Sequence, residues 1–304
     1  MKSLNQKLLL VGGKGGVGRT TTAASLGVCL ARSGRSVLVL DAAGAGGLTS
    51  AFNLGDAEVK PGVRISVDVG GAELAVLQLS TEVSLTEYVD RYVSLPVATS
   101  RLLDLGPLAR VFDYVSRAAP AVKEILTIGK ICHEAKNGEW DHVVVDGPAT
   151  GHMIELLSAP EALAEVVQVG PLIAHTAWMS ELLSDPEQTA AVLVTTPTEL
   201  AVSELFDLHA RVKAETQTKV GALVVNRMSQ VLSPEAAREA QALVDRKSGL
   251  APAIAVALSQ SELVQAQTER IDQLGLPSLY INESSTPVET AADALAALVH
   301  GHSP

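Results

Sequence analysis

The chain has 304 residues, of which 47% are hydrophobic, 19% are charged and only 3% are aromatic, and its formal net charge is −11. This length and composition predict one well-packed domain whose core consists of Ala, Val and Leu, as in parallel α/β sheets. The negative charge argues against nucleic-acid binding and against attraction to anionic lipid. We also expect a cytoplasmic protein without direct membrane insertion, because the sequence has only two distant cysteines, no signal-peptide pattern and no membrane-length apolar run.

Short apolar runs alternate with helical stretches, which is the pattern of a doubly wound, mostly parallel sheet in a single α/β domain over residues 1–304. A first helix should begin near Arg19 and end at Gly34, and a final helix should cover Pro287 to His300. About eight strands are predicted, at Leu8–Val11, Ser36–Leu40, Leu74–Leu79, His142–Val145, Ala191–Thr195, Val220–Val225, Ala253–Ala257 and Ser278–Ile281.

The first predicted strand leads into a glycine-rich turn, GKGGVGRT, at residues 13–20. Its spacing is that of a phosphate-binding loop (P-loop), with Arg19 where lysine is usual. Backbone N–H groups can point into such a turn, and the following helix adds the positive end of its dipole, so a polyphosphate is the expected ligand. Thr20 is placed to offer a hydroxyl to Mg²⁺. The alternative is a merely flexible loop, but strand, glycines, hydroxyls and helix occur in the required order.

Two other predicted strands are followed by aspartate, at Asp41 and Asp146. Ligands of open α/β sheets bind at the carboxyl edge of the parallel strands, where both carboxylates should lie. Asp41 is predicted to orient or deprotonate the water that attacks a γ-phosphate, or to hold a Mg²⁺-bound water. Asp146 is predicted to reach Mg²⁺ through water, as in a Walker B element. The alternatives are an Asp41 that caps the segment after it and an Asp146 that is a simple turn residue.

Several motifs together resemble one family. Residues 14–20 resemble the deviant Walker A motif KGGVGKT, and residues 146–152, DGPATGH, resemble the D-x-x-x-T-G-H segment of the arsenite-pump and tail-anchored-protein-targeting ATPases. The resemblance is in particular to the bacterial anion-transporting ATPase branch of that family. Residues 120–130 resemble the helical insertion of this branch, and residues 195–201 resemble its strand-turn-helix. The likeness spans nearly the whole chain.

This resemblance implies a dimeric ATPase that binds ATP and Mg²⁺. Lys14 would cross the dimer interface to the partner's nucleotide and serve catalysis together with Asp41, while Thr20 and Asp146 would hold the metal. Asn226 corresponds to an adenine-recognising asparagine, and an amide offers the base both a donor and an acceptor. A solvated Lys14 and a turn-forming Asn226 are the alternatives. The residues expected to bind the nucleotide are Gly13, Gly15, Gly16, Val17, Gly18, Arg19, Thr20, Thr21 and Asn226.

In the family, the D-x-x-x-T-G-H segment is a second switch that couples the γ-phosphate to a helical subdomain. We therefore call residues 146–152 the second switch, with Thr150, Gly151 and His152 as its motif residues, and residues 41–48 the first switch. The first switch departs from the family pattern because it lacks the proline, histidine and serine and is rich in Gly and Ala.

Two other departures concern chemistry. Arginine is not a conservative substitute where a compact ammonium must fit among phosphates, so Arg19 predicts slow hydrolysis. The sequence has no C-x-x-C motif, so neither the zinc site of eukaryotic targeting dimers nor a cysteine cluster for trivalent arsenic is expected.

Two insertions, residues 81–137 and 151–188, should be helical and form a subdomain for a client or partner, with Pro160, Pro171 and Pro186 as helix breakers in the second. Apolar residues recur at helical spacing from Leu102 to Val115 and from Ile125 to Ile131. This stripe could hold a hydrophobic client helix or a membrane-protein partner, although such stripes more often belong to a core.

Three functional hypotheses are consistent with these motifs. The first is an ATP-dependent dimeric switch, either a homodimer or a heterodimer with a paralogous ATPase. The second is a catalytically weakened subunit of such a heterodimer, whose paralogue supplies the active parts. The third is a positioning ATPase of the ParA/MinD type. The T-G-H motif, the long insertions and a C-terminal helix without Lys or Arg over residues 291–299 argue against the third.

Overall fold

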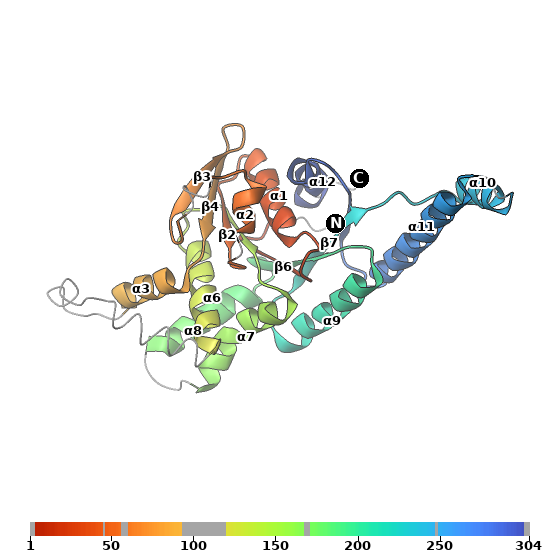
Figure 1. Ribbon diagram of the computed structural model, residues 1–304. Helices are drawn as coiled ribbons and strands as arrows, with labels where there is room; N and C mark the ends of the chain where they lie inside the picture. Colours follow the sequence, from red (N-terminus) through yellow and green to blue (C-terminus); the bar gives the residue numbers. More distant parts are fainter. Residues whose placement is uncertain are drawn as a thin grey trace.

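The computed structural model describes residues 4–44, 46–55, 60–92, 120–166, 171–246 and 249–300 (Figure 1). Within them, eight strands form one sheet in the order β3-β4-β2-β5-β1-β6-β7-β8. Only the pair β3–β4 is antiparallel. The predicted mostly parallel sheet is therefore confirmed. The strands are β1 (Leu8–Gly13), β2 (Val37–Asp41), β3 (Arg64–Asp68), β4 (Glu73–Gln78), β5 (His142–Asp146), β6 (Thr189–Thr195), β7 (Val220–Met228) and β8 (Ser278–Asn282).

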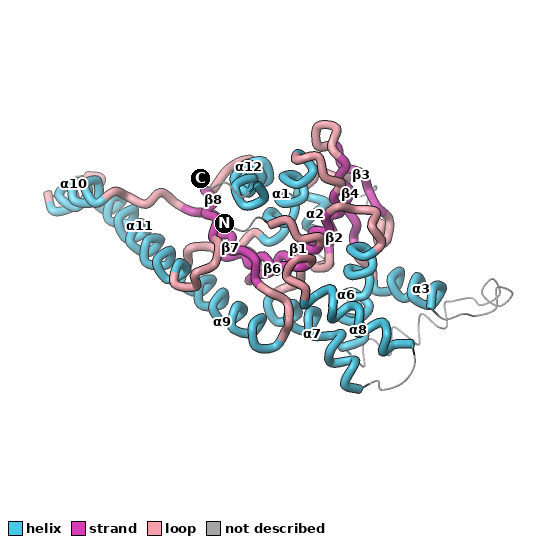
Figure 2. Tube along the Cα trace, turned by 180° about the vertical axis from the view of Figure 1, so that it is seen from behind, coloured by secondary structure: helices cyan, strands magenta, loops and turns pink. Residues whose placement is uncertain are grey.

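Helices cover both faces of the sheet. Figures 1 and 2 show α1 and α12 over one face and α6, α7, α8 and α9 over the other. The predicted first and last helices are confirmed as α1 and α12, and Gly34 takes a positive φ of 82° just beyond the end of α1. The helices are α1 (Arg19–Arg32), α2 (Gly47–Ala51), α3 (Thr81–Tyr92), α6 (Pro120–Lys136), α7 (Thr150–Val166), α8 (Pro171–Ser184), α9 (Glu199–Glu215), α10 (Pro234–Asp245), α11 (Ala251–Asp272) and α12 (Pro287–His300).

Each face of the sheet has its own apolar core. In β1, Leu8 and Leu10 pack on the side of α6–α9, whereas Leu9 and Val11 pack on the side of α1 and α12. Side chains alternate between faces along a strand, so a strand covered on both sides must be apolar at every position. This requirement explains the uninterrupted apolar runs of the central strands, and it places the polar residues at the strand ends.

One predicted strand was wrong, and one strand of the sheet was missed. Residues 253–257 belong to the helix α11, because an alanine-rich run continues helically when no sheet neighbour covers both of its faces. The strand β3 was missed because it is a short, partly exposed edge strand whose pairing with β4 creates it. The signal for it was present: residues 64–68 alternate polar and apolar residues, and Gly70 and Gly71, both with positive φ, connect them to the apolar run of β4.

The insertions are helical wherever the structure describes them, in α3, α6, α7 and α8. The proposed apolar stripe from Leu102 to Val115 lies outside the described residues. The α6 part of that stripe belongs mostly to the core, since Leu126, Ile128 and Ile131 are buried.

The three prolines of the second insertion do not all act as predicted. Pro171 begins α8 and Pro186 follows its end, but α7 continues through Pro160, so the prediction of a break at Pro160 was wrong. Buried neighbours, Leu156 and Leu157 among them, hold α7 against the core across the proline.

A buried charge network joins β3 to α6. Glu134 is 1% exposed and binds Lys130 at 2.8 Å and Arg64 at 2.7 Å. Burial alone would raise the pKa of Glu134, but these two cations outweigh burial and hold it below its ordinary value. The network is thus a structural feature on the side of the helical insertions.

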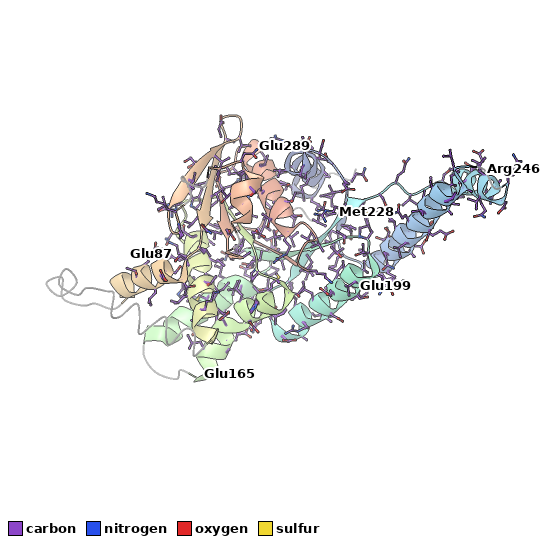
Figure 3. All side chains as sticks on the ribbon, in the orientation of Figure 1. Glu87, Glu165, Glu199, Met228, Arg246 and Glu289 are labelled. Atoms are coloured by element: carbon purple, nitrogen blue, oxygen red, sulfur yellow. The ribbon has the colours of Figure 1, made fainter. Side chains whose placement is uncertain are left out.

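The helices α10 and α11 form an arm that extends away from the sheet (Figures 1 and 2). In Figure 3, Met228 lies near the base of this arm and Arg246 at its far end. None of the α10 residues is buried, and large apolar side chains of the arm such as Leu250 and Val256 are exposed. Within the described part of the chain, no helix combines the length and apolarity that crossing a bilayer requires.

Candidate functional site

The glycine-rich loop lies at the carboxyl edge of the sheet, between the end of β1 at Gly13 and the start of α1 at Arg19. Gly15 and Gly16 are exposed, whereas Val17 is buried in the core beneath α1. The carboxylates at the ends of β2 and β5 are next to each other, because Asp41 and Asp146 are register partners. The structure thus brings the predicted loop and both predicted acids to one edge.

Gly18 is required by the shape of this loop. Its φ is +100°, and an added Cβ would overlap the side-chain amide of Asn226. That amide donates from Nδ2 to the carbonyl of Val17 at 3.0 Å. Asn226, which lies within β7, therefore supports the loop from below; its recognition of adenine stays a prediction.

Thr20 and Asp146 meet directly. The Thr20 Oγ1 donates to Asp146 Oδ2 at 2.6 Å, and the other carboxylate oxygen, Oδ1, is buried without a hydrogen-bond partner. Burial raises the pKa of Asp146 to about 6 and nearby Asp41 adds to the effect, while Thr20 and Arg19 oppose it. An acid in this environment favours a cation as a neighbour.

Asp41 caps the first switch. It is 2% exposed, and its Oδ1 and Oδ2 accept the backbone N–H groups of Gly44 at 2.8 Å and Gly46 at 3.1 Å. This is the capping arrangement that the sequence left open as an alternative. The water-positioning role of Asp41 stays a prediction, and it would require at least one of these oxygens to be released.

Both basic residues of the loop bind protein groups. Arg19 donates from Nη1 to the carbonyl oxygen of Gly147 at 2.6 Å. Lys14 Nζ lies 2.7 Å from Glu204 Oε1 on α9, and both of these side chains are roughly one-third exposed or less. The partner of Lys14 within the chain is therefore an acid of α9, and its reach to the nucleotide of a partner subunit stays a prediction.

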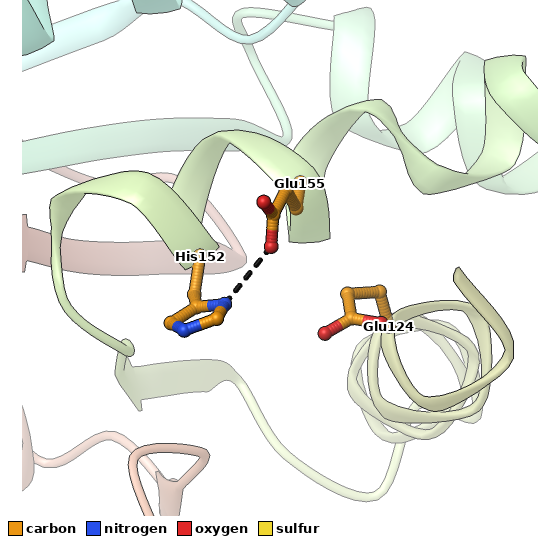
Figure 4. Close-up of side chains that lie close together, drawn as sticks. All are labelled: Glu124, His152 and Glu155. Carbon is orange, nitrogen blue, oxygen red and sulfur yellow. Dashed lines mark hydrogen bonds and ion pairs between the residues drawn. The ribbon is translucent and has the colours of Figure 1, made fainter. Parts of the chain in front are cut away.

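The motif residues of the second switch begin α7. Figure 4 shows His152 and Glu155 of α7 facing Glu124 of α6. His152 Nδ1 and Glu155 Oε2 share a hydrogen bond of 2.9 Å, and each of the three side chains has a possible ligand atom within 4.8 Å of the others. His152 and Glu155 are largely exposed, so this cluster by itself defines no metal centre, but it connects the second switch to the helical insertion.

Sequence reasoning missed two contact residues of the site, Gly147 and Glu204. Gly147 precedes a proline inside the recognised motif, and this position was the signal that could have identified it. Glu204 gives no local signal, because it is one of several acids on an amphipathic helix and meets Lys14 only through the order of strands in the sheet.

Comparison with known proteins supports the same family as the motifs do. The family model described as "Anion-transporting ATPase" matches residues 6–173. The protein named ATPase BagA from Mycobacterium tuberculosis is 29% identical over 227 residues, covering 73% of this chain and 65% of its own length. ATPase GET3C from Arabidopsis thaliana is 28% identical over 273 residues, covering 75% of this chain and 68% of its own length. The chain thus spans about two thirds of the length of these relatives.

The sheet order and the helices on both faces define an α/β protein with a fold consistent with the P-loop nucleoside triphosphatases. Within that class, the chain belongs to the anion-transporting ATPase family, since the family model covers more than half of it. The resemblance found in the sequence is confirmed.

Proposed function

We propose that the chain is an ATP-binding dimeric switch of this family, with slow Mg²⁺-dependent ATP hydrolysis that moves a helical part holding a client or partner. One observation supports this proposal above the others. Beside the glycine-rich loop, the Thr20 hydroxyl touches a buried Asp146 whose second oxygen has no partner. Buried polar atoms are nearly always paired, so the unpartnered oxygen indicates a site for a cation or its water.

The residues present fit Mg²⁺. This ion prefers carboxylate, hydroxyl and water oxygens together with substrate phosphates. Thr20 and Asp146 would hold it, and when bound it neutralises charge on the phosphates. The loop backbone from Gly13 to Thr21 would bind the polyphosphate through its N–H groups and the N-terminus of α1.

Catalysis would depend on two residues that now have other partners. Asp41 would position the attacking water after releasing the N–H group of Gly44 or Gly46, which a Gly- and Ala-rich first switch permits. Lys14 would reach the nucleotide of a partner subunit after leaving Glu204. The ion pair is partly exposed, so leaving it costs little.

Slow turnover follows from Arg19. Phosphoryl transfer depends on positioning and electrostatics, and the guanidinium is both bulkier than an ammonium and bound to Gly147. The proposed partner is a second copy of this chain or a paralogous ATPase. The proposed client is a hydrophobic helix or a membrane protein, and the proposed compartment is the cytoplasm.

Calorimetric ATP titration and phosphate release test this proposal on the wild type, Arg19→Lys and Asp41→Asn. We expect ATP binding by all three, faster turnover by Arg19→Lys, and turnover reduced about tenfold or more by Asp41→Asn. Arg32→Lys, on the same helix but outside the loop, is the matched control and should leave both measurements unchanged. A wild type that binds no ATP would refute the switch, and unchanged turnover in Arg19→Lys would refute the account of slow hydrolysis.

Sedimentation velocity with and without ATP tests the dimer. A wild type that stays monomeric with ATP bound, at all concentrations, would contradict the homodimer. Co-purification of the untagged chain with a paralogous ATPase would favour the heterodimer, and recovery of self-dimers alone would count against it.

A further inference from the structure

The short linker between β5 and α7 is held by three separate segments. The carbonyl oxygen of Asp146 accepts the N–H of Ala42 at 3.1 Å, and the N–H of Gly147 donates to the carbonyl of Val11 at 2.9 Å. The carbonyl oxygen of Gly147 accepts the Arg19 guanidinium at 2.6 Å. The first two contacts join backbone groups. The third is made by a side chain, and it belongs to the nucleotide-binding loop.

Gly147 is placed so that its carbonyl faces the loop. An added Cβ at Gly147 would lie 2.5 Å from the carbonyl oxygen of Val11, so only glycine fits this close to β1. The charged donor makes the bond from Arg19 stronger than one between neutral groups. It closes the β5–α7 linker against the start of α1.

Arginine and lysine differ in how they would make this contact. A lysine side chain is about one bond shorter and ends in a compact ammonium, so we expect it not to reproduce the hydrogen bond that the Arg19 guanidinium makes with the Gly147 oxygen. The residue that departs from the loop pattern is thus also the residue that reaches the second switch.

A linker held in this way also fixes the start of α7. This helix begins at Thr150 and packs against α6 of the first insertion, where His152 and Glu155 face Glu124 (Figure 4). The path from Arg19 to α6 therefore runs through one linker of three residues, 147–149, and the first turn of α7.

We propose that Arg19 is a positioning residue of the second switch, whose guanidinium holds the β5–α7 linker in place in the nucleotide-free chain. The proposal rests on the proposed function only in treating residues 146–152 as a switch. The loop already contacts this segment through the hydrogen bond from Thr20 to Asp146, and Arg19 adds a second side-chain contact at Gly147.

Amide hydrogen exchange measured by NMR on the nucleotide-free chain tests this proposal. The reporters are the N–H groups of Gly147 and Ala42, which bond across the linker, and that of Leu4, which bonds to Leu298 far from the site. In Arg19→Ala and in Arg19→Lys we expect the two linker amides to exchange about tenfold faster or more, the equivalent of losing one charge-assisted hydrogen bond. The Leu4 amide should be unchanged.

Arg32→Ala is the matched control, because Arg32 lies on the same helix and forms an exposed ion pair with Asp293. It should leave the linker amides unchanged. Faster exchange at the linker and at Leu4 alike would mean global destabilisation and would overturn the proposal. An exchange rate of the Gly147 amide in Arg19→Lys that equals the wild-type rate would also overturn the proposal. Arg19→Lys retains the positive charge and keeps the test available if Arg19→Ala does not fold. ATP titration of the same samples separates the proposed function from the proposed role of Arg19. If the chain bound no ATP, the proposed function would fail, but the exchange rates measured without nucleotide would still test the role of Arg19.

Discussion

The buried carboxylate of Asp146 makes the stability of the nucleotide-free chain depend on pH in a direction opposite to that of an ion-paired acid. Its pKa rises from 3.8 in the unfolded chain to about 6 in the fold, mainly through burial. Between these two values the folded state binds more protons than the unfolded state. The contribution of Asp146 to the free energy of unfolding therefore falls as the pH rises through this window.

The pKa difference corresponds to more than a hundredfold in the ionisation equilibrium, or about 3 kcal/mol in full. Asp146→Asn removes the ionisation and keeps an oxygen that can accept the hydrogen bond of the Thr20 hydroxyl. The free energy of unfolding of this variant therefore lacks the pH-dependent contribution of Asp146. The wild type should lose about 3 kcal/mol relative to Asp146→Asn as the pH rises from below 4 to above 6, and about half of that between about pH 5 and pH 7.5.

Urea unfolding followed by the fluorescence of Trp140 and Trp178 measures this difference at each pH. Subtracting the variant from the wild type cancels the other titrating groups, provided that the two chains share the same unfolding slope. A stability difference that is the same at both pH values would refute the desolvation argument. Added Mg²⁺ should reduce the pH dependence if the ion binds there, because it stabilises the charged carboxylate.

Three further predictions concern single substitutions. Gly18→Ala should lower the free energy of unfolding by about 2 kcal/mol and weaken ATP binding, because it adds a side chain at positive φ against a neighbouring amide; Gly15→Ala, with no protein atom near the added carbon, should leave the free energy of unfolding unchanged, as thermal melting would show. Glu134→Ala should cost about 3 kcal/mol in urea unfolding, since it leaves its two cationic partners without a buried anion, and a loss under about 1 kcal/mol would contradict this account. Glu204→Gln should change stability by less than about 1 kcal/mol while freeing Lys14; if the dimer forms through Lys14, sedimentation with ATP should show association at least as strong as in the wild type.

The sequence by itself determined the class of fold and the chemical composition of the candidate site. Apolar runs that must be buried on both faces predict central parallel strands, and seven of the eight predicted strands overlap strands of the sheet. The spacing of glycines at residues 13–18 and the carboxylates after two strands predict residues that meet at one sheet edge. These inferences succeed because they depend on local periodicity and on the common direction of parallel strands.

Only the tertiary structure decided what these residues touch. Arg19 and Gly147 are 128 positions apart, Lys14 and Glu204 are 190 apart, and Asn226 lies 209 positions after the carbonyl that it binds. Such partners are set by the order of strands in the sheet and by the helices packed on it, which no local pattern encodes. The same reason accounts for β3, which needs β4 to form, and for residues 253–257 of α11, which lie in the arm that extends away from the sheet (Figure 1). The sequence showed that Arg19 departs from the loop pattern, and the fold showed that its guanidinium binds the second switch.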